Sequence, residues 1–204
     1  MIPRIFEGET AIICAGGASL KSFDFDLLRD RRVIAINRAH EYLPYADVLW
    51  WTDARYWRRA YMTLQAHAAP YKATGNIEYH RHELPPGVTQ YLFTGPDGFD
   101  EHPEHLRHGW NSAYAATHLA VHLGAKKIVL LGVDLTHDGT RAGRNFHSGY
   151  DTLPIPAETM ERWKASFSTL APILAAKDVE VINGSPNSAL TIWPRCTPAD
   201  ALSA

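Results

Sequence analysis

The sequence predicts an α/β protein whose mostly parallel sheet is covered by helices on both faces. Short continuous apolar runs recur along the chain, as they do in strands buried on both sides. Segments of helical periodicity lie between these runs, an alternation that favours parallel strand order. A chain of 204 residues, 46% of them hydrophobic, also has the size and composition of one domain. These observations predict a single three-layer αβα domain of the Rossmann-like class, spanning residues 1–204.

The regular elements follow from the apolar pattern. The predicted strands are the buried runs 10–14, 32–37, 47–51, 127–131 and 179–183. The predicted helices are 23–28, 56–66, 112–123 and a long helix that starts near Pro156, whose last turns Pro172 should kink. In the third helix, apolar residues recur with i, i+3, i+4 and i+7 spacing, which marks one buried face.

Two stretches are less regular. Residues 70–110 are rich in proline, glycine and histidine, and we expect an irregular insertion over the site, with short strand candidates at 76–79 and 90–93. Residues 135–156 form a polar loop that we expect to be mobile. The tail after Pro194 is predicted to be frayed.

Composition narrows the classes of protein. A formal net charge of −2 gives no strongly basic balance that would make duplex nucleic acid the main partner. Cys14, in an apolar run, fits a core residue, and two cysteines make no disulfide framework. We find neither a secretory signal nor a run long enough to span a membrane. We therefore expect a cytoplasmic protein, and its tyrosines and tryptophans leave a homo-oligomer open.

Candidate ligand residues follow the predicted strands. They are Gly16, Gly17 and Ser19 after the first strand, Asn37, Asp53 and Asp134 after later strands, and 183–188 after the last. The carboxyl ends of parallel strands share one edge, so these residues should converge there. A glycine-rich turn before a helix lets backbone N–H groups approach a phosphate. The turn lacks the Gly-Lys-Ser/Thr of a P-loop, and Asn37 replaces the acidic residue of the dinucleotide fingerprint.

Six short segments, in order, carry a resemblance to a known family. They are 15–20, 36–37, 109–112, 130–134, 146–148 and 185–190. Together they resemble the Campylobacter-type sialyltransferases of lipooligosaccharide synthesis and the uncharacterised proteins around them, many of which are phage- or prophage-encoded. They also resemble the archaeal hydroxymethyl-dihydropterin pyrophosphokinases. The likeness covers roughly residues 10 to 193, and the segment 48–57 is most similar to the phage-encoded members.

The resemblance implies a nucleotide site and a catalytic group. The residues it implies in nucleotide contact are Gly16, Gly17, Ser19, Asn37, Asn111, Ser112, Pro186, Asn187 and Ser188. It implies His147 as the catalytic histidine. The transferases use paired tyrosines for the leaving phosphate, where the corresponding loop here holds Tyr150. The usual Gly-Pro-Ser-Leu is Gly-Ala-Ser-Leu in this chain.

Three functions remain open. The leading hypothesis is a glycosyltransferase-like enzyme that takes a sugar from a nucleotide-activated, in the resemblance CMP-linked, donor, with His147 as general base and His137 as its substitute. It requires no metal or other cofactor, and the acceptor is open. The second is a pyrophosphokinase in which Asp53 and Asp134 hold Mg²⁺; Asp134 can instead cap or orient its own loop. The third is a nucleotide-binding protein without catalysis.

Other conspicuous residues have structural explanations. His118 and His122 have the i, i+4 spacing of a zinc pair, but they lie opposite the apolar stripe of their helix, so we expect a solvated surface. The histidines 102, 105 and 108 lie in a loop among Glu and Pro residues, and a metal site there is the open alternative. Trp50, Trp51 and Trp57 are expected to pack in the core rather than stack on a base.

Overall fold

A seven-stranded parallel sheet forms the centre of the molecule. The computed structural model describes residues 2–75, 84, 86–136, 145–147 and 155–204. The sheet strands are β1 (Thr10–Cys14), β2 (Arg32–Ile36), β3 (Val48–Trp51), β4 (Tyr71–Thr74), β5 (Val88–Gln90), β8 (Lys127–Leu131) and β9 (Glu180–Asn183). Their order is β5-β4-β3-β2-β1-β8-β9, and every neighbouring pair is parallel. The predicted α/β fold with a parallel sheet is confirmed.

The strand order reverses beside β1. The chain moves outward from β1 through β2 and β3 on one side, and then returns to place β8 and β9 on the other. In register, Thr10 of β1 lies opposite Lys127 of β8, and Ala11 lies opposite Arg32 of β2. In open sheets of this kind, ligands bind outside the carboxyl ends of the strands at such a reversal. The fold therefore directs attention to the ends of β1 and β8.

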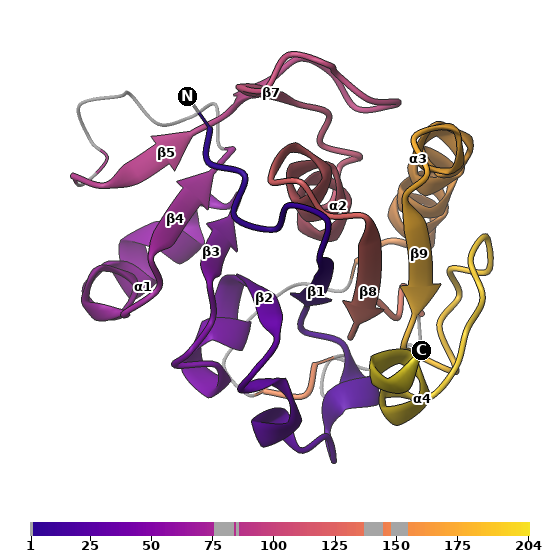
Figure 1. Ribbon diagram of the computed structural model, residues 1–204, viewed down its shortest axis with the longest axis horizontal. Coiled ribbons are helices and arrows are strands. Elements are labelled where there is room, and N and C mark those ends of the chain that lie inside the picture. Colours follow the sequence, from indigo (N-terminus) through magenta and orange to yellow (C-terminus); the bar gives the residue numbers. More distant parts are fainter. Residues whose placement is uncertain (1, 76–83, 85, 137–144, 148–154) are drawn as a thin grey trace.

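Helices cover both faces of the sheet (Figure 1). The helices are α1 (Ala54–Ala66), α2 (Ser112–His122), α3 (Ala157–Ala176) and α4 (Pro198–Ser203), with the short 3₁₀ helices η1 (Ala18–Leu20), η2 (Phe25–Leu28) and η3 (Asn37–Tyr42). Alternate residues of β1 enter opposite cores because side chains alternate along a strand. Ile13 packs with residues of α2 and α3, whereas Ile12 packs with residues of α1 and α4.

The three tryptophans at positions 50, 51 and 57 are core residues, as predicted. Trp50 and Trp51 are almost fully buried on opposite faces of the sheet. Trp57 of α1 stacks on Trp51, with 5.1 Å between ring centroids and 6° between ring planes. Cys14 is also buried, and burial raises the pKa of its thiol to about 12. It is an inert packing residue.

The segment 70–110 is more regular than the sequence predicts. Its first part supplies β4 and β5, which extend the main sheet beyond β3. Its later part contains a separate parallel pair, β6 (Leu92–Phe93) and β7 (His105–Leu106). All of the strand candidate 76–79, and much of the loop 135–156, lie outside the described residues. The expectation of an irregular insertion is thus wrong for the part of the segment that forms strands.

The tail after Pro194 is ordered, contrary to prediction. Backbone hydrogen bonds join Asn183 N to Pro194 O (2.9 Å) and Cys196 N to Asn183 O (3.1 Å). Thr197 then caps α4, since its side chain accepts a hydrogen bond from Asp200 N, and Ala201 is buried against the sheet. The tail therefore completes one core rather than fraying.

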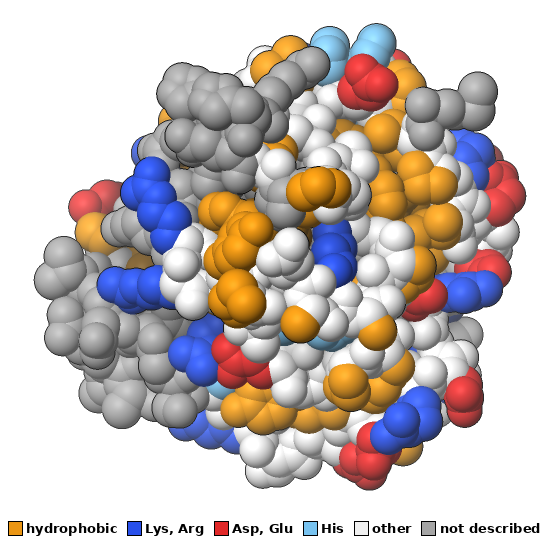
Figure 2. Space-filling view, turned by 90° about the vertical axis from the view of Figure 1, so that its left-hand side faces the viewer, with side chains coloured by type: hydrophobic (Ala, Val, Ile, Leu, Met, Phe, Trp, Pro, Cys, Tyr) orange, Lys and Arg blue, Asp and Glu red, His pale blue; other side chains and the backbone are white. Residues whose placement is uncertain are grey.

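The outer surface carries scattered apolar side chains. On the side of α1, β4 and β5, hydrophobic and basic side chains are interspersed (Figure 2). Met62 on α1 is 74% exposed. Within the described ranges, no helix is both long and apolar enough to cross a membrane. The homo-oligomer stays a prediction.

Candidate functional site

The turn after β1 is tied to the loop after β8 by an aspartate. Asp134 accepts hydrogen bonds from Ser19 N (2.9 Å) and Ser19 Oγ (2.6 Å), one at each carboxylate oxygen. A charged acceptor is well placed there because the backbone N–H groups of a helical first turn lack internal partners. Asp134 therefore stabilises the turn 16–19 from the end of the neighbouring strand β8.

Gly17 lets the two loops approach each other. Its N–H donates to Gly132 O (2.9 Å). A Cβ built on Gly17 would lie 2.4 Å from Gly132 O and 2.6 Å from the Asp134 carboxylate. Any side chain at this position would push the turn away from the end of β8. The glycine is required by contact with backbone, whatever ligand the turn holds.

The loop after β9 joins the same hydrogen-bond network through Ser185. Ser185 Oγ accepts a hydrogen bond from Gly132 N (3.1 Å) and lies 3.2 Å from Ser19 Oγ. Ser188 is buried, and its hydroxyl donates to Val133 O (2.7 Å). Within the predicted triplet, Pro186 and Asn187 are exposed while Ser188 supports the loop. Ser185 lies within the predicted range 183–188, and its two contacts here are with protein groups.

His147 lies against the glycine-rich turn. The residue is buried, and a Cβ built on Gly16 would lie 3.0 Å from its Nε2. The short described segment 145–147 runs along the turn, because Phe146 N donates to Gly16 O (3.0 Å) and Asn145 forms an antiparallel bridge with Gly17. The structure therefore brings the predicted histidine to the predicted turn. His137 and Tyr150 lie outside the described residues.

An aromatic cluster fixes the position of that segment. Phe146 packs its ring 5.0 Å from the rings of both Phe25 and Tyr42, measured between centroids. The His147 ring lies 5.0 Å from the Phe146 ring. Apolar packing beside the turn thus helps to position the imidazole.

Asn37 follows β2 at the same edge, in a strained conformation. Its φ is 50°, which asparagine tolerates better than most residues. Its carbonyl oxygen lies 2.8 Å from His40 Nδ1. Its side-chain Oδ1 is buried and has no hydrogen-bond partner within the described part of the chain. A buried acceptor without a donor is costly, so a hydroxyl or amine of a ligand would stabilise it.

Asn111 and Ser112 link the start of α2 to the end of β3. Asn111 is the N-cap of α2, since its Oδ1 accepts a hydrogen bond from Ala113 N (2.7 Å). Ser112 Oγ lies 2.6 Å from Thr52 Oγ1, and its carbonyl accepts from Trp50 Nε1 (3.0 Å). Thr52 is a member of this edge that sequence reasoning missed. Its position directly after a buried strand was the available signal.

The two candidate magnesium ligands do not share a position. Asp53 follows β3 and Asp134 follows β8, so three strand intervals separate them, roughly 14 Å at about 4.8 Å each. Both carboxylate oxygens of Asp134 already accept hydrogen bonds from Ser19. Among the described residues, no group of three or more His, Cys, Asp or Glu side chains could hold a metal ion. This arrangement does not favour a magnesium site built from the pair.

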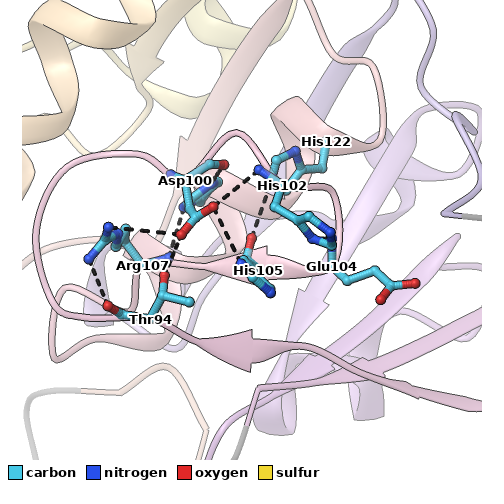
Figure 3. Close-up of polar contacts among 8 residues, drawn as sticks. Thr94, Asp100, His102, Glu104, His105, Arg107 and His122 are labelled. Atoms are coloured by element: carbon cyan, nitrogen blue, oxygen red, sulfur yellow. Dashed lines mark hydrogen bonds and ion pairs between the residues drawn. The ribbon is translucent and has the colours of Figure 1, made fainter.

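A separate group of histidines, which includes His102, His105 and His122, lies where the segment 94–108 meets α2 (Figure 3). His118 is fully buried, so the expectation that it faces solvent is wrong. The segment 94–108 packs over the face of α2 that lies opposite its apolar stripe. That face is therefore not exposed to solvent around His118. His118 Nδ1 accepts from Arg107 N (3.0 Å), and its Nε2 lies 3.0 Å from Asp100 O. Burial lowers the pKa of His118 to about 3.

The neighbouring histidines also hold backbone. His122 is half-buried rather than solvated, and its Nε2 lies 3.1 Å from His105 O. His102 Nδ1 accepts from Glu104 N (3.3 Å), and Asp100 Oδ1 lies 3.5 Å from His105 Nδ1. These contacts stabilise the segment 94–108 internally and connect it to α2. The cluster is structural.

Comparison with known proteins supports the fold. No family model matches the sequence, and no curated protein matches it significantly. The chain is similar in structure to the sialyltransferase CstII from Campylobacter jejuni, solved in complex with a substrate analogue, cytidine-5′-monophosphate. The TM-score is 0.58 at 15% sequence identity, over 94% of this chain and 86% of that one. A likeness at this identity shows a shared sialyltransferase-like fold.

Proposed function

We propose that the protein is a glycosyltransferase-like enzyme that takes its sugar from a nucleotide-activated donor, with a cytidine monophosphate carrier as the first candidate. The observation that carries the proposal is the placement of a buried histidine, His147, against the Gly16–Gly17 turn at the reversal of the sheet. Ligands of such sheets bind at this edge. The likeness in fold to a transferase with bound cytidine-5′-monophosphate is consistent with that site.

The proposed site consists of residues that bind the nucleotide and a residue that acts as the general base. Asn37 offers a buried acceptor to a ribose hydroxyl or a base amine. Gly16 and Gly17 keep the turn free of side chains, so that a phosphate can come close to backbone. Asn111 and Ser112 border the same edge on the side of α2.

His147 supplies the reacting group in this proposal. Its imidazole takes the proton of an acceptor hydroxyl. The acceptor oxygen forms a bond to the anomeric carbon while the bond from that carbon to the phosphate oxygen breaks. Cytidine monophosphate leaves with the electron pair, and direct displacement inverts the anomeric configuration. The proton ends on His147, and no oxidant, reductant or metal takes part.

Calorimetry tests the binding half of the proposal. The purified chain is titrated with CMP and with ATP, each with and without Mg²⁺. Binding of CMP that does not depend on the metal is the expected result. Metal-dependent binding of ATP in preference to CMP would support a pyrophosphokinase instead.

Turnover tests the catalytic half. Release of CMP from CMP-linked sugar donors is measured for the wild-type chain, for His147→Ala and for His102→Ala, a control at an exposed histidine of the other cluster. The proposal expects turnover that only His147→Ala removes. CMP binding without turnover across the donor panel would indicate a binding protein that lacks the reaction.

A further inference from the structure

Strained backbone gathers at the carboxyl edge of the sheet. Among the described residues, positive φ occurs at four non-glycine positions, and three of them lie at this edge: Asn37 (50°), Trp110 (57°) and Leu135 (47°). Such conformations are energetically unfavourable and tend to cluster where a site needs them. For a bulky residue such as tryptophan, positive φ is a clear outlier. Trp110 therefore calls for an explanation that helix capping by Asn111 does not give.

Local contacts hold Trp110 in its strained position. Its N–H donates to His108 Nδ1 (3.0 Å), and the two rings meet edge to face with 4.8 Å between centroids. Trp110 is nevertheless 47% exposed as a residue, whereas Trp50 and Trp51 are almost fully buried. The chain thus fixes a large apolar ring at the surface directly before the N-cap of α2.

An arginine from a second helix lies over that ring. Arg162 on α3 places Cζ 4.5 Å from the centroid of Trp110. Its side chain is exposed, and among the described residues it has no carboxylate partner, unlike Arg32 or Arg38. A guanidinium stacked on an indole keeps its N–H edges directed outward, and those edges match a carboxylate or phosphate in a two-bond fork.

We propose that Trp110 and Arg162 form an acceptor subsite for a sugar that carries an anionic group. The exposed part of the indole packs against the apolar face of the sugar ring, and the Arg162 guanidinium binds its carboxylate or phosphate. The subsite rests on the proposed glycosyl transfer for its role. It assigns the acceptor to the rim between the starts of α2 and α3, while the nucleotide occupies the ends of β1 and β2.

NMR titration of the whole chain tests the subsite without requiring turnover. The six tryptophans give six indole N–H signals, and Trp110→Phe identifies the one from Trp110. Methyl β-glucuronide and glucose 6-phosphate are the anionic probes, and methyl β-glucoside is the neutral control. Arg162→Gln removes the proposed anion partner. Arg58→Gln, at another exposed arginine on α1, is the matched control.

The expected result is a saturable shift of the Trp110 signal with at least one anionic sugar. Affinity should fall about tenfold or more with methyl β-glucoside and in Arg162→Gln, since a charge-assisted hydrogen bond is worth about 1.5–3 kcal/mol. Arg58→Gln should leave it unchanged. Absence of a shift, equal shifts with charged and neutral sugars, or an unchanged affinity in Arg162→Gln would overturn the proposal.

A CMP titration in the same samples separates the two proposals. It is followed at the Gly16 and Gly17 amide signals. If these signals respond to CMP while Trp110 ignores the sugars, the subsite fails and the nucleotide site stands. If Trp110 responds and the glycine signals do not, the nucleotide site fails and the sugar subsite stands by itself.

Discussion

The carboxyl edge around β1 and the segment 94–108 over α2 both contain histidines, and the two regions use them differently. Where the segment meets α2, ring nitrogens are occupied by the backbone: His118 of α2 by Arg107 N and Asp100 O, and His102 by Glu104 N. At the edge, polar side chains such as Asp134 and Ser185 hold the loops, and aromatic packing positions His147 beside Gly16. A histidine count therefore says little about chemistry. The contacts of each imidazole are more informative: backbone groups hold His118 and His102, whereas aromatic packing positions His147 beside the turn.

Replacing one histidine from each region gives the largest expected contrast. His147→Ala should lower the turnover of a CMP-linked donor about 10²–10⁴-fold, the usual worth of a general base, with CMP affinity retained. His102→Ala should stay near the wild-type rate. The measurement is steady-state release of CMP. Equal rates for His147→Ala and the wild type would remove His147 from the mechanism.

Glycine substitutions test how tightly the edge is packed. Gly17→Ala places a methyl group 2.4 Å from Gly132 O, and we expect a loss of about 3 kcal/mol in the free energy of unfolding, at the upper end of overpacking costs. The control is Gly8→Ala, where φ is 72° but nothing lies within 4 Å; about 1 kcal/mol is expected there from φ alone. Urea denaturation measures both. Equal losses of the free energy of unfolding in Gly17→Ala and Gly8→Ala would show that the loops after β1 and β8 can move apart at no cost.

Acid should weaken the histidine segment. The pKa of His118 is about 3 in the folded chain because of burial, against an ordinary 6.5. The unfolded chain therefore binds the proton first, so His118 stabilises the fold above pH 6.5 and that contribution declines as pH falls from 6.5 towards 3. Each pH unit in that window costs up to about 1.4 kcal/mol. Burial also lowers the pKa of His67, His108 and His122, which act in the same direction.

The free energy of unfolding at pH 7.5 and pH 5 measures this effect. In the wild-type chain we expect a loss of about 2 kcal/mol from His118 between these values. His118→Gln, which does not titrate, should show a smaller difference between the two pH values than the wild type. An identical pH dependence in both chains would mean that His118 is protonated without cost.

Asp134→Asn should have the smallest effect of the set. The substitution keeps one acceptor oxygen for Ser19 and loses the charge, so we expect a loss of about 1 kcal/mol in the free energy of unfolding. If Asp134 supports the turn, the Mg²⁺ dependence of nucleotide binding should not change. Calorimetry with and without Mg²⁺ checks this, and a metal response that disappears in Asp134→Asn would restore the aspartate as a ligand.

The sequence predicts the central strands well because their burial is visible locally. The run 127–131 is apolar enough to identify a strand buried on both faces, and strand β8 occupies it. Strands β4 and β5 are mostly half-buried at one side of the sheet, so their composition carries no comparable signal. The C-terminal tail does carry a local signal for a helix. Thr197 stands before Pro198 and is followed three residues later by Asp200, a pattern typical of a helix start.

The candidate site divides in the same way. The glycine turn, Asn37 and the cap at Asn111 are local signals, and each lies at the expected edge. The bonds from Ser19 to Asp134 and Ser185 join residues more than a hundred positions apart, so tertiary packing alone decides them. His118 shows the reverse error. The predicted apolar stripe on α2 is buried, as expected. The opposite face is buried as well, because the segment 94–108 packs over it.

A crystal structure of the chain with bound CMP tests the central claim most directly. We predict that the nucleotide lies at the carboxyl ends of β1 and β2, with a ribose or base donor on Asn37 Oδ1, its phosphate next to Gly16 and Gly17, and His147 beside that phosphate. CMP bound elsewhere, or at this edge with His147 turned away from the nucleotide, would contradict the account.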